Sequence, residues 1–453
     1  MRCTRRSRMN GWSSRPLNDT HYDILIAGGG QAGIPLAGAL AKSGRRVALA
    51  ERKYLGGSCV NFGCTPTKAA IASARVAHLA RRAADFGLRI PTVEVDFPAL
   101  IERARGMAEH SRNGLARHFG DNPELIRGHA RFTGRSGSAF TLTVADRLIT
   151  ADEVVLDTGT RSAIPKMDGL DKIDYLTAEN WLYHTELPEH LALIGGGYVG
   201  LEMGQFYRRM GSRVTVWHQG SRIAPREDED VSLAMQKLLE REGIEFRLNV
   251  QPRSVAELGA THVFIGAGRM PNTDDVGLET VGVETTRGIV KVDKRLASNV
   301  SGIWAAGDIR GGLMSTHTSW DDYRILESQM IGSGSRTTDR VVPYAMFTDP
   351  ELGRVGLTEK EARDQGSKIR VTRFEMSGNG KATEIGETDG FIKVVLDEDT
   401  GKILGAAVLA TEGAELVHMY IDIMNADAPA SVIHDAIHIH PTLAEAVQSA
   451  VTP

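Results

Sequence analysis

The sequence predicts an α/β protein with two Rossmann-like dinucleotide-binding domains and a C-terminal α+β domain. Two observations support this fold class. An apolar strand, a glycine-rich turn, a helix and a second strand occur in that order twice, and after about residue 340 the pattern changes to alternating strands followed by helical stretches. At 453 residues, the chain is also too long for one ordinary hydrophobic core, and its length favours about three domains.

The first copy of the repeated unit begins with the apolar residues 23–27 and breaks at Gly28-x-Gly30-x-x-Gly33. The first glycine allows a tight turn, the second lets the backbone approach a pyrophosphate, and the third lets helix and strand pack closely. Because free N–H groups at a helix N-terminus favour anions, we expect a dinucleotide diphosphate here. Glu51, at the end of the next strand, can accept hydrogen bonds from ribose hydroxyls.

The second copy begins at residue 191 and breaks at Gly195-x-Gly197-x-x-Gly200. It is followed by a helical pattern and by the apolar strand 212–217. The same spacing of glycines, strand and helix predicts a second nucleotide-binding turn.

The position of Glu51 is taken by His218 in the second copy, with Arg222 and Arg226 just beyond it. A carboxylate at this position repels a 2′-phosphate, whereas a cation attracts it. The pattern therefore favours NADPH over NADH. The alternative is that these are ordinary surface charges and that the site takes NADH.

Each unit is closed by an apolar strand that ends in a small-residue turn and a proline, at 154–165 and at 263–272. A further strand and turn occur at 301–312. The last third of the chain contains the predicted strands 390–397 and 402–410. The turn residues predicted to contact a cofactor are Thr158, Gly159, Gly268 and Arg269.

Two of the three cysteines, Cys59 and Cys64, lie close together in the sequence. Five steps of regular helix or strand would place their Cα atoms beyond the ~7 Å limit for a disulfide, so the segment between them must bend, and Gly63 makes a bend possible. Pro66 suits the first turn of a helix that starts near Cys64. Because a helix N-terminus lowers the pKa of a thiol, Cys64 is placed to be a thiolate. Two inert reduced thiols are the alternative.

Near the C-terminus, the segment 438–445 brings together His438, His440 and Glu445. Histidine is the natural acid–base group near neutral pH, and a carboxylate can orient its ring. Pro441 is expected to open a helix and to place Glu445 about one turn further on. The group therefore suits proton transfer to and from a redox cysteine pair.

The composition excludes several classes of protein. The 53 basic and 57 acidic side chains nearly balance, which predicts neither a nucleic acid nor a membrane surface as a partner. No apolar stretch reaches the ~20 residues that a bilayer span needs. A metal site is not expected, since no second ligand pair lies near the cysteines. Residues 1–20 carry five arginines without an apolar run, so they predict a disordered tail rather than a secretory signal, and the protein is expected in the cytoplasm.

The order GxGxxG, GGxCxNxGCxPxK, GxGxxG, AAGD and HxHPTxxE resembles the pyridine nucleotide–disulfide oxidoreductases over residues 21–448. Within that family the chain is similar to mercuric-reductase-like and dihydrolipoamide-dehydrogenase-like flavoproteins, through residues 51–68, 226–232 and 344–359. The resemblance implies an FAD-binding domain (21–160 and 277–340), an NAD(P)-binding domain (161–276) and a dimerisation domain (341–453).

The resemblance also implies roles for individual residues. Cys64 would face the flavin as the charge-transfer thiol, and Cys59 would attack the substrate. Lys68 would lie beside the flavin ring and pair with Glu202. His440, oriented by Glu445, would move the proton from the other subunit of a homodimer. The residues implied to hold FAD are Gly28, Gly30, Gly33, Glu51, Gly57, Ser58, Thr158, Gly159 and Asp308, and those implied to hold the nicotinamide nucleotide are Gly195, Gly197, Gly200, His218, Arg222, Gly268 and Arg269.

Two departures from the family pattern limit how many of these family properties can be expected of this chain. The chain ends without the vicinal cysteine pair of mercuric reductase, so mercuric reductase activity is not expected. Only ten residues separate 247–250 from 261–268, where the family has a longer antiparallel excursion, which predicts a shortened NAD(P) domain.

The sequence favours an enzyme that passes electrons from NAD(P)H through FAD to Cys59 and Cys64, and then to a disulfide or another thiol-reactive small molecule. One alternative is a dihydrolipoamide dehydrogenase that reduces NAD⁺. A second is a flavin redox sensor that does not turn over, for which the shortened NAD(P) domain is the one favourable feature.

Overall fold

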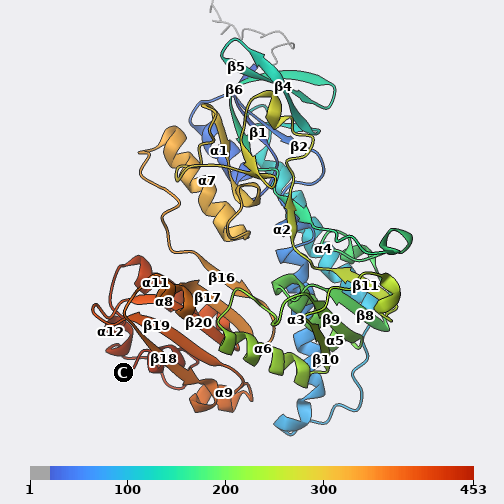
Figure 1. The fold of residues 1–453 in the computed structure, drawn as a ribbon, viewed down its shortest axis with the longest axis vertical. Coiled ribbons are helices and arrows are strands. Elements are labelled where there is room, and N and C mark those ends of the chain that lie inside the picture. The colour runs from blue at the N-terminus through green and yellow to red at the C-terminus, as the bar shows by residue number, and fades with distance from the viewer. Residues whose placement is uncertain (1–20, 453) are drawn as a thin grey trace, which may run out of the picture.

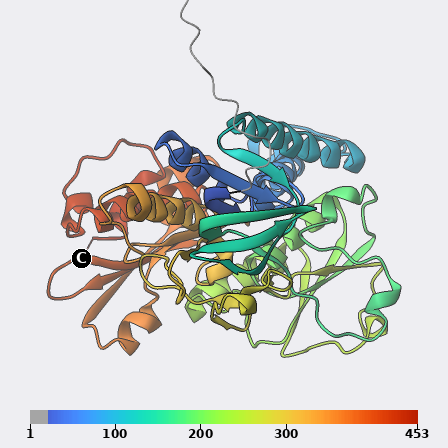
Figure 2. The ribbon, with the colours of Figure 1, turned by 90° about the horizontal axis from the view of Figure 1, so that it is seen from above.

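The computed structural model describes residues 21–452, which form three domains (Figure 1). Two of them contain a parallel sheet with a glycine-rich turn, and the third is an antiparallel α+β domain, so the predicted fold class is confirmed. Seen from above, the second domain (green) and the C-terminal domain (orange and red) lie on opposite sides of the molecule (Figure 2). The prediction of a disordered tail at 1–20 lies outside the described residues.

The first domain is built on a seven-stranded sheet in the order β3-β2-β1-β6-β5-β4, with β15 also paired to β6. The strands β3, β2, β1, β6 and β15 are parallel, whereas β4, β5 and β6 form an antiparallel meander. Alternate apolar side chains of these strands are fully buried, which places the core on both faces of the sheet. The strands are β1 (His21–Ala27), β2 (Val47–Glu51), β3 (Glu124–Arg127), β4 (Ala130–Ser136), β5 (Ala139–Val144), β6 (Arg147–Leu156) and β15 (Ile303–Ala305).

The register of this sheet brings the ends of distant segments together. Ala27, the last residue of β1, lies opposite Leu156, the last residue of β6. The glycine-rich turn after β1 and the turn after β6 therefore meet at one edge of the sheet. The helices α1 (Gly33–Lys42) and α7 (Thr316–Ile331) pack on each other over this sheet.

Three helices follow the first βαβ unit and reach into the second domain. They are α2 (Gly57–Asn61), α3 (Cys64–Arg81) and α4 (Phe97–Leu115). Alanines on one face of α3 pack against α4 and against the aromatic side chains of the second domain. Small side chains on α3 therefore let the redox segment and the second domain approach closely.

The second domain has a four-stranded parallel sheet in the order β10-β9-β8-β11. Its elements are β8 (His190–Ile194), α5 (Tyr198–Met210), β9 (Arg213–His218), α6 (Glu229–Arg241), β10 (Ile244–Leu248) and β11 (His262–Ile265). The connection 249–261 contains one 3₁₀ turn, Val255–Glu257, and no strand. A short antiparallel ribbon of β7 (Thr160–Ser162) and β12 (Arg269–Pro271) joins this domain to the first.

The C-terminal domain contains a five-stranded antiparallel sheet in the order β16-β17-β20-β19-β18. Its apolar face is covered by short helices, and these together bury a separate core. The elements are β16 (Pro343–Met346), β17 (Glu351–Gly356), α8 (Glu359–Asp364), β18 (Ile369–Glu375), α9 (Gly380–Glu384), β19 (Phe391–Asp397), β20 (Ile403–Ala410), α10 (Gly413–Leu416), α11 (His418–Asn425), α12 (Ser431–His434) and α13 (Ala444–Ser449). Outside this domain, a small hairpin of β13 (Thr285–Thr286) and β14 (Ile289–Val290) precedes β15 of the first domain.

One predicted boundary in this domain is wrong. A helix was expected to open at Pro441, but α13 begins at Ala444. Thr442 instead donates its backbone N–H to Glu445, so the residues after the proline form a turn that leads into the helix.

No helix between residues 21 and 452 combines the length and the apolar character needed to cross a membrane.

Candidate active site

A large cavity lies where the three domains meet. Its volume is about 1250 Å³, which exceeds the usual range for small-ligand sites and suits a dinucleotide. Residues from both nucleotide-binding turns and from the C-terminal domain line it, among them Gly28, Gly30, Glu51, Gly57, Ser58, Cys59, Cys64, Lys68, Thr158, Gly159, Gly197, Glu202, Gly268, Arg269, Asp308 and Phe347. The tertiary structure therefore brings most of the residues selected from the sequence to one wall or another of the same cavity.

The first glycine-rich turn has a shape that a side chain would fill. Gly28 has a φ of +114°, and a Cβ there would lie 2.1 Å from the carbonyl oxygen of Asp157. A Cβ on Gly30 would lie 2.6 Å from the carboxyl group of the same residue. Glu51 accepts a hydrogen bond of 2.8 Å from the N–H of Gly29, which fixes its carboxylate beside the turn. These features fit the ADP half of a dinucleotide, with its diphosphate on the backbone.

The two cysteines lie on either side of a sharp bend. Helix α2 is a single turn, which ends when the N–H groups of Phe62 and Gly63 both donate to the carbonyl of Ser58. A Cβ on Gly63 would lie 2.9 Å from that carbonyl, so glycine permits the bend. Helix α3 then begins at Cys64, as the sequence predicted.

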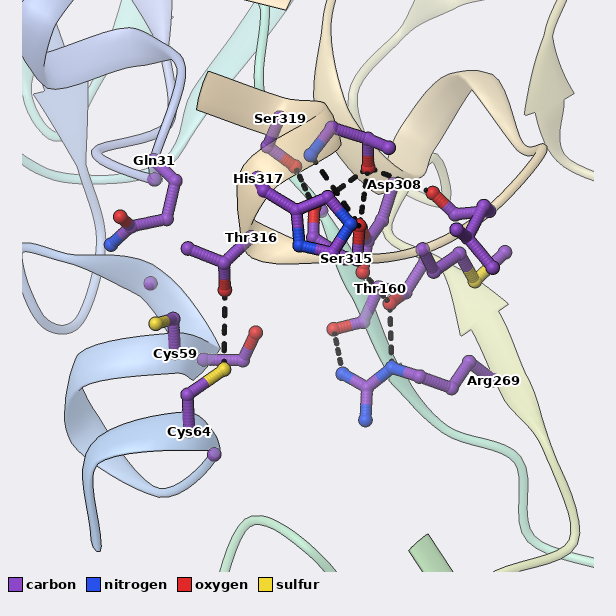
Figure 3. Close-up of a pocket in the computed structure, with 18 of the residues that line it drawn as sticks. Gln31, Cys59, Cys64, Thr160, Arg269, Asp308, Ser315, Thr316, His317 and Ser319 are labelled. Carbon is purple, nitrogen blue, oxygen red and sulfur yellow. Dashed lines mark hydrogen bonds between the residues drawn. The ribbon is translucent and has the colours of Figure 1, made fainter. Parts of the chain in front are cut away.

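Cys64 is the more acidic thiol of the pair. The hydrogen bond from Cys59 lowers the pKa of Cys64 to about 6, helped by Thr316 and by the charge of Lys68, although burial opposes the shift. The Thr316 hydroxyl donates to the Cys64 thiolate, with an Oγ1···Sγ distance of 3.2 Å (Figure 3). The pKa of Cys59 is raised, first because Cys59 donates to Cys64 and second because it is partly buried. At neutral pH the pair therefore consists of a Cys64 thiolate and a Cys59 thiol.

Lys68 and Glu202 form an ion pair on the cavity wall. Lys68 Nζ lies 2.8 Å from Oε2 of Glu202, a carboxylate that is only 4% exposed. The other carboxylate oxygen accepts the N–H of Phe347 at 2.8 Å, and the ammonium group lies 4.5 Å from the centre of the Phe347 ring. One pair thus joins α3, α5 and the C-terminal domain beside the cysteines.

Asp308 lies on the opposite wall, as Figure 3 shows. Its carboxylate accepts a hydrogen bond of 2.9 Å from Thr160, whose hydroxyl accepts one of 2.7 Å from Arg269. Burial raises the pKa of Asp308, and the Thr160 hydroxyl opposes that shift. Thr158 is held nearby by two hydrogen bonds with Asn272, of 2.8 and 2.9 Å.

The second glycine-rich turn repeats the geometry of the first. Gly195 has a φ of +120°, and a Cβ there would lie 2.2 Å from the carbonyl oxygen of Gly266. A Cβ on Gly200 would lie 2.1 Å from the carbonyl oxygen of Gly195. Gly197 reaches the cavity, whereas Gly195 and Gly200 shape the turn from behind. The turn fits a second dinucleotide.

His218 does not carry the positive charge that the sequence suggested. Its Nδ1 accepts the N–H of Gly196 at 3.3 Å, in the same way that Glu51 accepts from Gly29. Burial lowers the pKa of His218, so the ring is neutral at pH 7. Arg222 is half-buried, does not line the cavity, and within residues 21–452 donates a side-chain hydrogen bond to the carbonyl of Pro225 at 3.2 Å.

His440 and Glu445 are paired but lie away from the cysteines of their own chain. Nδ1 of His440 lies 3.0 Å from Glu445, whose other oxygen accepts the N–H of Thr442. These two contacts, first that of Thr442, hold the pKa of Glu445 below its ordinary value. His440 is 76% exposed and does not line the cavity.

Sequence reasoning missed two groups of cavity residues. The first is the start of α7, where Ser315, Thr316 and His317 line the cavity and Thr316 reaches Cys64 (Figure 3). Ser315 before a helical run is an N-cap signal that the sequence offered, but it does not reveal a contact with Cys64, which lies 252 positions away from Thr316. The second is Asp157, which lies under the first glycine-rich turn.

The fold and the site define a class of protein. Two dinucleotide-binding turns and a close pair of thiols with very different pKa values share one cavity, as in a flavoprotein that exchanges electrons between a nicotinamide nucleotide and a disulfide.

Comparisons with known proteins identify the family. Residues 22–322 match the model of the pyridine nucleotide-disulphide oxidoreductases, and residues 342–451 match the dimerisation domain of the same family. The chain belongs to the pyridine nucleotide-disulphide oxidoreductase family. It is an FAD-dependent enzyme that uses NAD(P)H, as the sequence predicted.

Relatives span nearly the whole chain. The probable pyridine nucleotide-disulfide oxidoreductase RclA of Escherichia coli is 32% identical over 447 residues, which cover 94% of this chain and 98% of that protein. The dihydrolipoyl dehydrogenase of Chlorobaculum tepidum is 31% identical over 451 residues, or 95% of this chain and 96% of the relative.

Solved structures agree with this assignment. The HOCl-induced flavoprotein disulfide reductase RclA of Escherichia coli superposes with a TM-score of 0.85 at 32% identity, covering 95% of this chain and 99% of the other. A Cu(II) complex of the same protein gives a TM-score of 0.86 at 31% identity, covering 96% and 99% of the two chains. LpdA of Mycobacterium tuberculosis gives 0.86 at 25% identity, covering 95% and 99%.

Proposed function

We propose that Cys59 and Cys64 are the redox-active pair of this enzyme and that it works as a reductase of small disulfides or other thiol-reactive acceptors. FAD, when bound, transfers two electrons between the nicotinamide nucleotide and the cysteine pair. The first glycine-rich turn with Glu51 and Asp308 would hold FAD, and the second turn would hold the nicotinamide nucleotide.

The observation that carries this proposal is the asymmetry of the two thiols. Cys64 is a thiolate on the cavity wall, stabilised by Cys59, Thr316 and Lys68. A thiolate in that place can interact directly with a flavin held by the first turn. Cys59 remains protonated, and it is therefore the thiol available for exchange with a substrate.

Exchange at Cys59 requires a base, because only its thiolate attacks a disulfide. We assign this role to His440 of the partner subunit of a homodimer, since His440 is exposed, oriented by Glu445 and outside the cavity that the cysteines of its own chain line. The Cys59 sulfur would attack the substrate disulfide, form a mixed disulfide and release one substrate thiolate. That thiolate would take the proton from the imidazolium. The Cys64 thiolate would then attack the Cys59 sulfur of the mixed disulfide, close the Cys59–Cys64 disulfide and release the second substrate thiolate, which takes a proton from solvent.

Anaerobic reduction of the enzyme tests the assignment of the two thiols. We expect a long-wavelength charge-transfer absorbance when the wild-type enzyme takes up two electrons. Cys64→Ser should abolish this band because it removes the thiolate. Cys59→Ser is the matched control: it cannot form the disulfide, so its free Cys64 thiolate should give the band before any reductant is added, while turnover is lost. A band that persists in Cys64→Ser would contradict the assignment.

A dihydrolipoamide dehydrogenase that reduces NAD⁺ is the second candidate function. The dihydrolipoyl dehydrogenases among the relatives, at 30–31% identity, favour it. Comparison of kcat/KM for dihydrolipoamide with NAD⁺ against kcat/KM for NADH and NADPH with disulfide acceptors separates the two. The family assignment favours either enzyme over a flavin sensor that does not turn over.

For the nicotinamide nucleotide, we propose that the enzyme accepts NADPH without excluding NADH. A neutral His218 removes the repulsion that a carboxylate would exert on a 2′-phosphate, and Arg222 supplies the nearby positive charge. The ratio of kcat/KM for NADPH to that for NADH tests this proposal. A ratio far below one would contradict it.

The acceptor is proposed by chemical class only. Because one relative was solved as a Cu(II) complex, a screen of acceptors for the pre-reduced enzyme should include Cu(II) beside disulfides and quinones. A reducing compartment such as the cytoplasm suits a free thiol pair, and we propose that location.

A further inference from the structure

Asp157 is a buried carboxyl group at the edge where the first nucleotide would bind. It follows β6 directly, it is 6% exposed, and its N–H donates to the carbonyl of Ala27 at 2.8 Å. Its Oδ2 accepts the N–H of Gly33, the first residue of α1, at 2.8 Å. The carboxyl group therefore lies inside the glycine-rich turn, beside the N-terminus of the helix.

The fold does not require a side chain at this position. Gly266 is the corresponding residue of the second unit, because its carbonyl lies under Gly195 as that of Asp157 lies under Gly28. Its N–H donates to the last residue of β8 at 2.8 Å, the same bond that Asp157 makes to the last residue of β1. The second unit thus forms its turn with Gly266 at this position, whereas the first unit forms the same turn with the carboxyl group of Asp157 inside it.

The second oxygen of Asp157 has no hydrogen-bond partner within residues 21–452. Oδ1 faces Gly307, where a Cβ would lie 2.9 Å away, but the N–H of Gly307 already donates to Asp322. Asp157 also lines the cavity. An oxygen of a largely buried carboxyl group that is open to the cavity, and that no described protein group satisfies, can hydrogen-bond to a molecule bound in the cavity.

Three acidic side chains, each from a different part of the fold, face Asp157. They come from Glu51 at the end of β2, Asp308 after β15 and Asp322 on α7. Asp322 is neutralised by two arginines, Arg310 and Arg340, at 2.6 Å each. Burial first, and then these acids, raise the pKa of Asp157 well above its ordinary value, against the Gly33 N–H that lowers it.

We propose that Asp157 is an additional FAD-binding residue that acts as a neutral carboxylic acid, donating a hydrogen bond from Oδ1 to the dinucleotide and releasing FAD when it ionises. In this state Oδ2 accepts from α1, and the proton on Oδ1 gives the anionic diphosphate a donor. Loss of that proton to solvent removes the donor and places a negative charge beside the diphosphate. FAD affinity should therefore fall as pH rises through the pKa of Asp157. This inference rests on the proposal that the Gly28 turn holds FAD.

Titration of the apoprotein with FAD over the neutral and alkaline range tests the role of Asp157. Quenching of flavin fluorescence gives the dissociation constant at each pH. For the wild type, we expect the constant to rise by about tenfold per pH unit above the pKa, as one linked proton requires. Asp157→Asn keeps an acceptor for Gly33 and a donor on the other atom, so its affinity should lose this pH dependence. Asp157→Gly, the residue of the second unit, should bind FAD more weakly than Asp157→Asn at low pH.

Infrared difference spectra provide a readout that does not depend on affinity. The C=O stretch of a protonated carboxylic acid should be present in the wild type at neutral pH and absent in Asp157→Asn. An Asp157→Asn variant with the pH profile of the wild type, or an ionised Asp157 at neutral pH, would overturn the inference while leaving the FAD site intact. Failure of the wild type to bind FAD at any pH would overturn the proposed FAD site together with the role of Asp157.

Discussion

At the scale of single residues, one hydroxyl group adds to the effect of Cys59 in lowering the pKa of Cys64. Thr316, at the start of α7, stabilises the charged form of Cys64 through a hydrogen bond. Lys68 lies on the same helix as Cys64 and stabilises the thiolate through its positive charge. A hydrogen bond to a charged group is worth about 1.5–3 kcal/mol, so its loss should change a pKa by about one to two units. The Cys64 thiolate is therefore stabilised in part by a residue far from it in sequence.

Replacement of Thr316 by valine should raise the pKa of Cys64 from about 6 toward the ordinary value of a thiol. Because the thiolate reacts, alkylation of Cys64 in the reduced wild type should increase as pH rises through about 6 and then level off. In Thr316→Val the same increase should occur at higher pH. The rate is followed by mass spectrometry of the peptide that contains Cys64.

Thr316→Ser is the matched control, because it retains the hydroxyl and should keep the pH profile of the wild type. Equal profiles for the serine and valine variants would show that the hydroxyl does not stabilise the thiolate.

At the scale of elements, α5 joins the three domains through one polar face. Glu202, Gln205 and Arg209 are spaced three and four residues apart, so they lie on the same side of the helix. Glu202 binds Lys68 of α3, while Gln205 and Arg209 bind Asp349 of the C-terminal domain. The helix that follows the second nucleotide turn thus also positions the lysine beside the cysteines.

Removal of the Arg209 side chain should strongly destabilise this junction. Arg209 is 6% exposed and pairs with Glu242 at 2.7 Å and with Asp349 at 2.5 Å. Breaking a buried pair leaves an uncompensated charge, so Arg209→Ala should lower the free energy of unfolding by about 3–5 kcal/mol. Denaturant-induced unfolding of the holoenzyme measures this change.

The exposed pair of Arg213 and Glu245 provides the comparison. Arg213 is 61% exposed, and Arg213→Ala should cost only about 0–1 kcal/mol. Similar losses for the two alanine variants would contradict a structural role for the buried network.

At the scale of the whole molecule, the proposed mechanism needs two chains. The general base proposed for Cys59 lies on a surface of the C-terminal domain that also exposes two large apolar side chains, Ile437 and Ile439, at 101% and 79%. Full burial of such a side chain is worth about 1.5–3 kcal/mol. Ile439 directly precedes His440 and Ile437 lies two residues before Ile439, so a partner subunit that covers them would also contact His440.

The double variant Ile437→Asp/Ile439→Asp should therefore be monomeric and should lose disulfide reduction. NAD(P)H should still bleach its bound FAD, since that step needs only one chain. Light scattering coupled to size-exclusion chromatography gives the oligomeric state, and stopped-flow absorbance separates flavin reduction from turnover.

Leu148→Asp serves as the control, because Leu148 is 59% exposed on the first domain and should leave the dimer intact. A monomeric double variant with full turnover would show that His440 acts within its own chain or not at all.

The sequence by itself determined the local features of this protein: two glycine-rich turns, the bend between Cys59 and Cys64, and the helix that begins at Cys64. These follow from residues a few positions apart, where backbone sterics and hydrophobic periodicity decide the conformation. The tertiary structure alone decided which distant groups meet. Sheet register places Asp157 under the turn at Gly28, packing brings Thr316 to Cys64, and burial makes His218 neutral. No local pattern encodes such contacts, because they depend on how separate strands and helices pack.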